Sequence, residues 1–578
     1  MLKLNASLVM PTFLPSQKTA ALLTPVFAMR RANDMGIGDT RAVLESIDFC
    51  ASHQFGILQL LPIHETVGDH SPYNPISSRA LSPALLTLEP DWVPGLTQDT
   101  LDSLAPASWL DQLREGPVKH LSVHPLKLQI LQEAANHFET QSDLSSELLQ
   151  NYEDFQLQSS SWLPGYTLFR TLVQEYGGNA HWEQWRPEHH TLAGAENWLA
   201  THPERDRLEA WRRGFTFIQW VAWRQWLEVR RYADKRGVLL MGEMSFGVSR
   251  NSADVWLHPT LFDRDWSMGT RPVSYFDTNK DSERWGQNWG LPPYRWENHR
   301  SEDFAWLRGR LQSEAQFFHL CRLDHLRGYF RGYMFPWQGG AQHAEFATLT
   351  EEEVKLKTHG LLPRFVPGPD EQENTAQMND LQGREIISVM QAAAGNMGLI
   401  AELMGLMPPY MRQALDDLQV PNLTFPLLEK DADGKLLHQD TFRPLSLVAY
   451  GNHDHAPIAA VYSRLHEPTG EGVGPSEDLK NLLQFAHWKE PAPESLNSEL
   501  LSALQKSLFE TPCLIAALMC MDVIGTAQRF NLPGSYGSLT WCERLEMSWA
   551  ELEKHPVYGP RIQEVERWIQ ETGRAPVS

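Results

Sequence analysis

Residues 319–325 read HLCRLDH, a strand-like apolar run that closes on a carboxylate, and three further segments repeat this pattern. They are VLLMGEM (238–244), GLIAELM (398–404) and SLVAYGNHD (446–454). Their acidic residues, in chain order, are Glu243, Asp324, Glu402 and Asp454. A carboxylate at the end of a buried strand is costly to desolvate, so four of them in one chain indicate a common purpose.

Helical stretches separate these segments, as expected of parallel strands that are joined by helices. Further strands are predicted at TPVFAM (24–29), ILQLLPI (57–63), LTFPLL (423–428) and CLIAALMCMDVIG (513–525). About eight strands in alternation with helices favour a (β/α)8 barrel. Catalytic residues of such barrels lie at the carboxyl ends of the strands, so we expect the four acids to line one cleft.

The spacing of apolar residues also predicts several helices of this barrel. One begins at Thr40, and a long one spans about 215–236 and stops at Gly237. Two more are expected near 302–319 and 384–395.

We interpret residues 1–578 as a single interrupted barrel without a separate C-terminal β-domain. Three insertions are expected to form subdomains on it. Residues 88–205 read as a mainly helical insertion, 245–297 as an active-site loop insertion, and 332–382 as a loop insertion after the strand of Asp324. The two loop insertions follow strands, so they are expected at the catalytic end.

The composition narrows the class of protein. A net charge of −22 argues against nucleic acid or an anionic membrane as a partner, because both require a basic surface. The five cysteines show no CxxC spacing and are interpreted as reduced core residues of a cytoplasmic protein. The start, MLKLNASLVMPTFLP, lacks the long apolar region of a signal peptide, and no apolar run approaches the roughly 20 residues of a membrane span.

The carboxylates suit the cleavage of a glycosidic bond with retention, which requires two carboxyl groups about 5–5.5 Å apart. Asp324 is the better candidate nucleophile, because Arg322 faces the same side of its strand and would keep it ionised. Glu402 follows the apolar run GLIA, which would raise its pKa as a general acid requires. Asp454, which follows Asn452 and His453, is suited to bind sugar hydroxyls.

Structural roles are the alternative for each of these residues. Asp324 and Arg322 could form an ion pair, and Glu402 could be a buried acid whose hydrogen bonds are satisfied. His453, Asp454 and His455 could bind a metal, but they are too close in sequence to supply a full coordination sphere, and no HExxH motif accompanies them. The sequence has no G-x-S-x-G, P-loop or G-x-G-x-x-G motif, which removes the commonest rival chemistries.

The chain resembles the amylomaltases, or 4-α-glucanotransferases, also called disproportionating enzymes, of the α-amylase clan. The combination of RLDH-x-RG, a downstream AE-x-x-G and then HD is specific, and the matching segments follow the family order over nearly the full length. These segments are GIGD (36–39), LQLLPI (58–63), GDHSPYNPISSRALSPALL (68–86), FIQWVAWRQW (217–226), SADVW (252–256), WGLPPYRW (289–296), RLDHLRGYF (322–330), IAELMG (400–405), GNHD (451–454) and FNLPG (530–534).

The resemblance implies a barrel enzyme that needs no cofactor and no metal and acts on an α-1,4-glucan or maltooligosaccharide. It implies that Asp324 is the nucleophile, Glu402 the acid/base and Asp454 the stabiliser of the transition state. Trp289 would shape the cleft, with core packing as the alternative. The substrate-binding residues would be Arg322, His453, Tyr73, Glu243, Trp289 and Asn452.

Several segments depart from the family pattern and leave donor and acceptor preference open. Glu243 replaces the usual Asp, and its side chain would reach about one methylene further into the cleft. The other departures are AELMG for AEDLG (401–405), GNHDH for GTHDN (451–455), RPVSYF for the Pro-Pro-Asp loop (271–276) and TWCERL for NWRWR (540–545).

The sequence therefore predicts transfer of α-1,4-glucan segments to the 4-hydroxyl of an acceptor glucan or glucose by double displacement. Hydrolysis by the same residues, glucan binding without catalysis, and transfer to an unusual acceptor are the alternatives.

Overall fold

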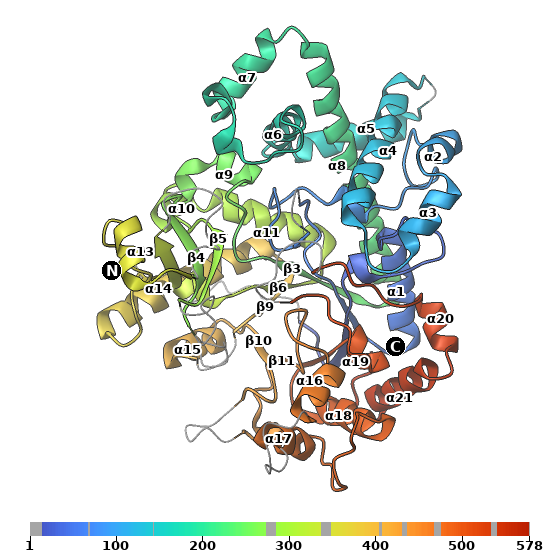
Figure 1. The fold of residues 1–578 in the computed structure, drawn as a ribbon, viewed down its shortest axis with the longest axis vertical. Coiled ribbons are helices and arrows are strands. Elements are labelled where there is room, and N and C mark those ends of the chain that lie inside the picture. Colours follow the sequence, from blue (N-terminus) through green and yellow to red (C-terminus); the bar gives the residue numbers. More distant parts are fainter. Residues whose placement is uncertain are drawn as a thin grey trace.

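The computed structural model describes residues 14–66, 70–142, 144–272, 285–336, 348–403, 407–429, 436–466, 476–532 and 540–576. At its centre, eight parallel strands close into a barrel in the order β1-β12-β11-β10-β9-β6-β3-β2 (Figure 1). The strands are β1 (Thr19–Leu23), β2 (Ile57–Gln59), β3 (Leu239–Met244), β6 (Leu320–Leu323), β9 (Gly398–Ala401), β10 (Asn422–Thr424), β11 (Ser446–Ala449) and β12 (Ile515–Met519). The prediction of a (β/α)8 barrel is confirmed.

The prediction of the first strand at 24–29 was wrong. The strand is the preceding segment TAALL, and Val26–Ala28 form a 3₁₀ turn. Pro25 explains the difference, because proline has no N–H to donate to a sheet. The last ladder bond on this side comes from Thr24, whose N–H donates to the Gln59 carbonyl.

Helices α1 (Thr40–Ser52), α8 (Arg205–Arg236), α11 (Ala305–Phe317) and α14 (Glu373–Ala394) pack around the barrel. Helix α8 ends at Gly237, which has the left-handed conformation, as predicted. It begins at Arg205 and not near residue 215. The prediction missed its first ten residues because they are mostly polar and carry no continuous apolar stripe. The helix expected near 302–319 is α11. It begins at Ala305, because Asp303 and Phe304 have positive φ and separate it from the short helix α10 (Trp296–Ser301). Helix α14 also begins earlier than expected.

Residues 88–205 form helices, several of which pack against α8, and they run from blue through cyan to teal in Figure 1. They are α2 (Gln98–Leu104), α3 (Ala107–Arg114), α4 (His120–Thr140), α5 (Ser146–Gln158), α6 (Leu163–Glu175) and α7 (Leu192–Thr201).

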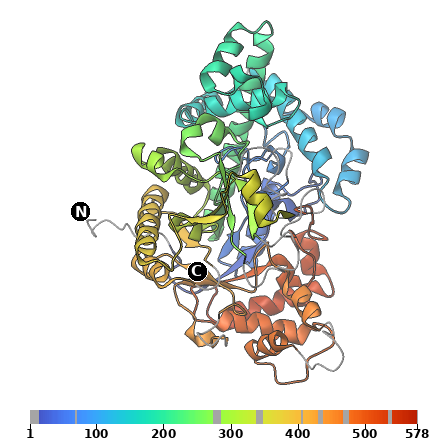
Figure 2. The same cartoon turned by 60° about the vertical axis from the view of Figure 1, so that its left-hand side comes forward.

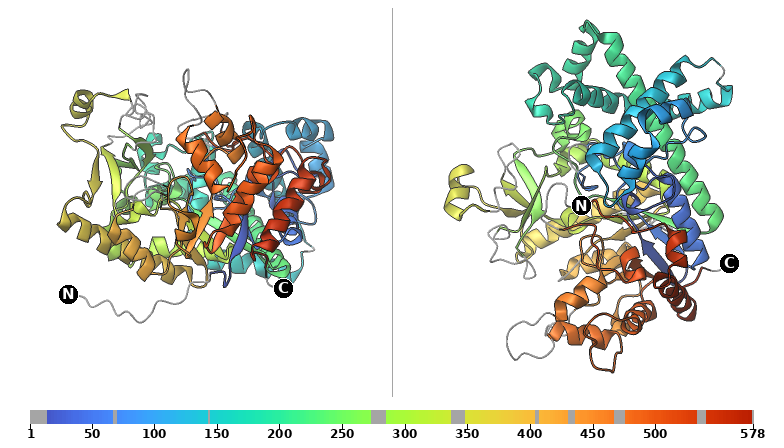
Figure 3. Two further views of the ribbon diagram at one scale, coloured as in Figure 1. Left: turned by 90° about the horizontal axis from the view of Figure 1, so that it is seen from below. Right: turned by 45° about the vertical axis from the view of Figure 1, so that its right-hand side comes forward.

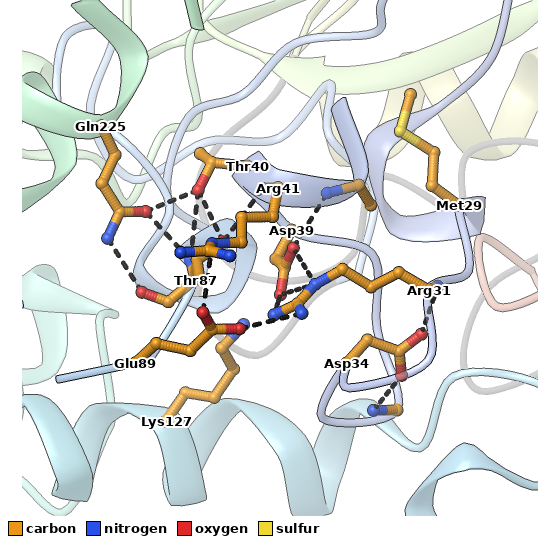
Figure 4. Close-up of polar contacts among 12 residues, drawn as sticks. Met29, Arg31, Asp34, Asp39, Thr40, Arg41, Thr87, Glu89, Lys127 and Gln225 are labelled. Carbon is orange, nitrogen blue, oxygen red and sulfur yellow. Dashed lines mark hydrogen bonds and ion pairs between the residues drawn. The ribbon is translucent and has the colours of Figure 1, made fainter. Parts of the chain in front are cut away.

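A buried polar network lies at the start of α1, beside Lys127 of α4, as Figure 4 shows. Asp39 caps α1 by accepting the Ala42 N–H at 3.1 Å, and it binds the Arg31 guanidinium at 2.8 Å. Arg31 also reaches Glu89 at 2.9 Å, and the buried Lys127 of α4 donates to the Ala84 carbonyl at 2.7 Å. The GIGD segment that ends at Asp39 is therefore a structural joint.

Residues expected to be loops form a second sheet beside the barrel, in green to yellow in Figure 2. Its antiparallel order is β5-β4-β7-β8, with the strands β4 (Trp266–Thr270), β5 (Gln287–Leu291), β7 (Gly332–Pro336) and β8 (Arg364–Val366). The insertions 245–297 and 332–382 thus pair with each other through β4 and β7. Their parts 273–284 and 337–347 lie outside the described residues.

The helices that follow β11 and β12 are orange to red in Figure 3. Together with these, the remaining helices are α9 (Ala253–Leu257), α12 (Arg327–Phe330), α13 (Glu351–Lys357), α15 (Pro409–Asp417), α16 (Ile458–His466), α17 (Glu477–Phe485), α18 (Ser498–Glu510), α19 (Cys520–Ile524), α20 (Trp549–Lys554) and α21 (Tyr558–Glu571). All five cysteines are buried and free. Among the described residues, no helix combines the length and apolar character needed to cross a bilayer.

Candidate active site

The four predicted acids lie at the carboxyl ends of barrel strands. Glu243 is the penultimate residue of β3, while Asp324 and Glu402 directly follow β6 and β9. These three strands are neighbours in the barrel, and Asp454 lies in the loop after β11. The structure therefore brings Glu243, Asp324 and Glu402 together around one side chain, that of Arg322.

Arg322 is 1% exposed and contacts three carboxylates. It is the register partner of Glu243 in the parallel pair β3–β6 and bonds to its carboxylate. Its Nη2 lies 2.9 Å from Glu402 Oε1, and its Nη1 lies 3.6 Å from Asp324 Oδ1. The sequence placed Arg322 beside Asp324, but its closer partners are the acids of the two flanking strands.

Asp324 and Glu402 lie close enough to shift each other's pKa, and each accepts a backbone N–H from a neighbouring loop. The Phe246 N–H donates to Asp324 Oδ2 at 3.2 Å, and the His325 N–H donates to Glu402 Oε2 at 2.8 Å. His325 has φ of 43°, in the left-handed region that non-glycine residues rarely adopt. The chain thus turns at His325, directly after the N–H that binds Glu402.

The pKa directions of the pair are the reverse of those expected from the sequence. Burial and the neighbouring Glu402 carboxylate raise the pKa of Asp324 well above its usual range. Burial also opposes ionisation of Glu402, but the Arg322 guanidinium and the His325 N–H outweigh it and lower the pKa of Glu402. The sequence argument failed because it assigned Arg322 to Asp324 alone and could not foresee the N–H of His325.

Asp454 is held by donors from two sides. Its Oδ2 lies 3.1 Å from His453 Nε2, and its Oδ1 accepts from the Asn531 amide at 2.7 Å. Although desolvation opposes ionisation, His453 and these hydrogen bonds lower the pKa of Asp454. With 42% of its side chain exposed, Asp454 is an ionised group that is open to solvent.

Tyr73 connects Glu243 to His453. Its hydroxyl donates to Glu243 and lies 3.2 Å from His453 Nδ1, and its ring stacks on that imidazole at 4.8 Å. Glu243 does not project into the cleft as expected, because its carboxylate is fully buried against Tyr73 and Arg322. Burial raises the pKa of Glu243, although Arg322 and His453 act in the opposite direction.

Asn452 and Trp289 lie behind these groups. The Asn452 side chain is buried, and its oxygen accepts the Asp454 N–H at 3.0 Å, while its Nδ2 is buried without a hydrogen-bond partner among the described residues. Trp289, on β5, is half-buried and packs edge-on against the His325 ring at 4.8 Å. Both residues thus touch the loops that carry the acids.

Sequence reasoning missed Phe246, His325, Asn531 and Trp541 as parts of this site. The rings of Tyr73 and His453 each lie 5.7 Å from Trp541. Asn531 belongs to FNLPG, which could have drawn attention to it, whereas Phe246 and His325 act through backbone N–H groups that no side-chain pattern shows. Within the described residues, no group of three or more His, Cys, Asp and Glu is arranged to hold a metal ion.

The chain is similar to known proteins in sequence and in fold. The family model described as 4-alpha-glucanotransferase matches residues 24–548. A 4-alpha-glucanotransferase of Chlamydia pneumoniae is 27% identical over 561 residues, which cover 94% of each chain. One of Synechocystis sp. is 27% identical over 520 residues, which cover 86% of this chain and 89% of the relative.

Two solved amylomaltases share the fold. The enzyme from Streptococcus agalactiae, in complex with acarbose, has a TM-score of 0.73 at 18% identity, with 97% of this chain and 100% of that one covered. The enzyme from Corynebacterium glutamicum has a TM-score of 0.74 at 19% identity, with 95% and 75% covered.

Proposed function

The chain belongs to the 4-alpha-glucanotransferase family, and on this premise we propose that Asp324, Glu402 and Asp454 carry out its glycosyl transfer. The substrates are an α-1,4-glucan or maltooligosaccharide donor and an acceptor glucan or glucose, which receives the segment on its 4-hydroxyl. The observation that carries the assignment is the pair of Asp324 and Glu402, which follow the adjacent strands β6 and β9 and both contact Arg322.

The strands of this pair suit retention. Adjacent parallel strands lie about 4.8 Å apart, so residues that follow them can present carboxyl groups at the separation of about 5–5.5 Å that retaining enzymes require. In the first step, an oxygen of ionised Asp324 attacks the anomeric carbon while Glu402 gives its proton to the departing glycosidic oxygen. In the second, Glu402 takes the proton of the acceptor 4-hydroxyl, whose oxygen displaces Asp324. Two inversions give net retention.

The carboxylates around Arg322 must hold a proton, because this single guanidinium faces Glu243, Asp324 and Glu402. The reaction requires that proton on Glu402 and an ionised Asp324. We propose that glucan binding favours this distribution, and that Asp454 then stabilises positive charge on the distorted sugar.

The other predicted residues would hold the reacting carboxylates in place or bind the sugar. Arg322 holds three carboxylates in place, and Tyr73, Glu243 and His453 form the wall beside Asp454. We place Trp289 and Asn452 at the edge of the same subsite as binding residues. Five free, buried cysteines are typical of a reducing compartment, and we propose that the enzyme is cytoplasmic.

Incubation with maltotriose tests this function, with products resolved by chain length over time and Asp324→Asn as the inactive control. A ladder of longer maltooligosaccharides together with released glucose or maltose is expected. Shorter sugars alone, with one new reducing end for each bond broken, would make the enzyme a hydrolase. No change in maltotriose would contradict the proposed donor.

A further inference from the structure

The peptide unit between Ser245 and Phe246 is hydrogen-bonded on both sides. Its N–H donates to Asp324 Oδ2 at 3.2 Å. Its carbonyl oxygen accepts from Arg310 Nη2 at 2.8 Å, and the same nitrogen lies 2.9 Å from Ser245 Oγ. The N–H and C=O of a planar trans peptide point in opposite directions, so a donor that fixes the carbonyl also fixes the direction of the N–H.

The following peptide is fixed in the same way. The Phe246 carbonyl accepts from the Tyr294 hydroxyl at 2.5 Å, and this hydroxyl lies 3.5 Å from Arg310 Nη1. The Phe246 ring packs edge-on against Tyr329 at 5.0 Å, and it fills the space beside Gly328 that a Cβ would occupy. The loop after β3 therefore has little freedom to turn its N–H away from Asp324.

Arg310 brings a buried positive charge to this loop. It lies on α11, is 1% exposed, and forms no ion pair among the described residues. Glu314 and Asp254 are the acidic groups near it, and neither is within bonding distance. A guanidinium that polarises a carbonyl strengthens the N–H of the same peptide as a donor.

We propose that Arg310 and Tyr294 are positioning residues for the nucleophile, acting through the Ser245–Phe246 peptide to hold and polarise the N–H that binds Asp324. This inference rests on the proposed role of Asp324. The N–H favours the ionised form of Asp324, and it acts against Glu402 and Glu243, the acids that face Asp324 alongside the cation Arg322. Arg310 and Tyr294 are both buried behind the loop that carries Phe246, so their effect on the reaction is indirect.

The full-length variants Arg310→Met, Arg310→Lys and Tyr294→Phe test the proposal with maltotriose. Arg310→Met is expected to lower kcat by about 10- to 100-fold, since small misplacements of reacting groups cost this much. It should move the acid-side inflection of kcat/KM upward by about one pH unit, because a hydrogen bond to the ionised form is weakened. Arg310→Lys should recover part of both losses, and Tyr294→Phe should shift both in the same direction by less.

Arg574→Met is the matched control. Arg574 is also buried and donates to two backbone carbonyls, those of Phe509 and Thr511. It should lose stability without any shift in the pH profile. Wild-type kcat and an unmoved inflection in Arg310→Met, or an equal shift in Arg574→Met, would overturn the proposal. If Arg310→Met does not fold, unchanged profiles in Arg310→Lys and Tyr294→Phe would overturn it.

A failure of the proposed function can be distinguished from a failure of this inference. Turnover by Asp324→Asn would remove the nucleophile assignment, whatever the Arg310 variants do. An inactive Asp324→Asn together with a wild-type pH profile in Arg310→Met would remove only the positioning role.

Discussion

Two buried arginines organise two carboxylate clusters, and the clusters differ in charge balance. Around Arg31, the anions Asp39 and Glu89 face the cations Arg31, Arg41 and Lys127 (Figure 4). Around Arg322, a single guanidinium faces Glu243, Asp324 and Glu402. The first cluster can keep its acids ionised, while the second has more carboxylates than cations and must hold a proton.

This difference separates a joint from a reaction centre. Although burial opposes ionisation of Asp39, Arg31 lowers its pKa, and a fixed ion pair results. In the second cluster, burial and Glu402 raise the pKa of Asp324. A proton that two carboxyls share can move, and acid/base catalysis needs such a proton. An excess of carboxylates over cations at the ends of neighbouring strands thus distinguishes this site.

Removal of one acid from each cluster should give opposite results. Asp324→Asn is expected to lower kcat by at least about 10⁴-fold, because no nucleophile remains, while stability holds or rises as repulsion falls. Asp39→Asn should cost about 3 kcal/mol of unfolding free energy by leaving Arg31 poorly paired, with activity per folded molecule retained. Maltotriose turnover and urea unfolding of both variants make the comparison. A stable, active Asp324→Asn would break it.

The acid role of Glu402 can be isolated by the choice of leaving group. Glu402→Gln is expected to lose about 10²- to 10⁴-fold with maltotriose, whose leaving sugar needs a proton. An activated donor such as a glucosyl fluoride needs little protonation, so its first step should be nearly unaffected. Burst kinetics with both donors measure this step. An equal loss with both donors would count against the acid assignment.

The pH dependence of stability should have opposite signs in the two clusters. Asp39 has a lowered pKa, so its contribution is present above the unfolded value of 3.8 and is lost as the pH falls below it. Asp324 has a raised pKa, so its protonated form favours folding below 3.8, and that contribution is lost as the pH rises.

Differences between wild type and each Asn variant isolate these contributions from other groups, such as Asp522, whose pKa burial raises to about 7. Urea unfolding from about pH 3 to pH 8 measures the unfolding free energy of wild type minus that of each variant. This difference should rise with pH for Asp39→Asn and fall with pH for Asp324→Asn. Parallel slopes would show that the clusters are electrostatically alike.

The sequence could predict the barrel because most of its strands are short apolar runs, although the first strand, Thr19–Leu23, was placed too late in the chain. It could place the acids at one end because parallel strands share an edge. The β4–β7 pair was not predictable, since its strands are polar or glycine-containing and lie far apart in the chain. The reversed pKa directions were also hidden, because they depend on which strand neighbour Arg322 reaches and on the backbone conformation of His325.

The smallest expected effect concerns Glu243, which has a structural counterpart in Glu65. Each is a buried glutamate that accepts from a tyrosine and binds an arginine: Tyr73 and Arg322 for Glu243, and Tyr166 and Arg170 for Glu65.

Glu243→Asp removes one methylene, so it cannot keep both contacts, and Arg322 is released toward Asp324. We expect kcat/KM for maltotriose to fall by about tenfold, which corresponds to about 1.4 kcal/mol. The acid-side inflection should move downward, because more of the Arg322 charge then acts on Asp324. Glu65→Asp is the matched control, which should lose stability while the inflection stays in place. If both variants lose only stability, with kcat/KM and the inflection unchanged, Glu243 has a structural role like that of the cluster around Arg31 and is not part of the reaction centre.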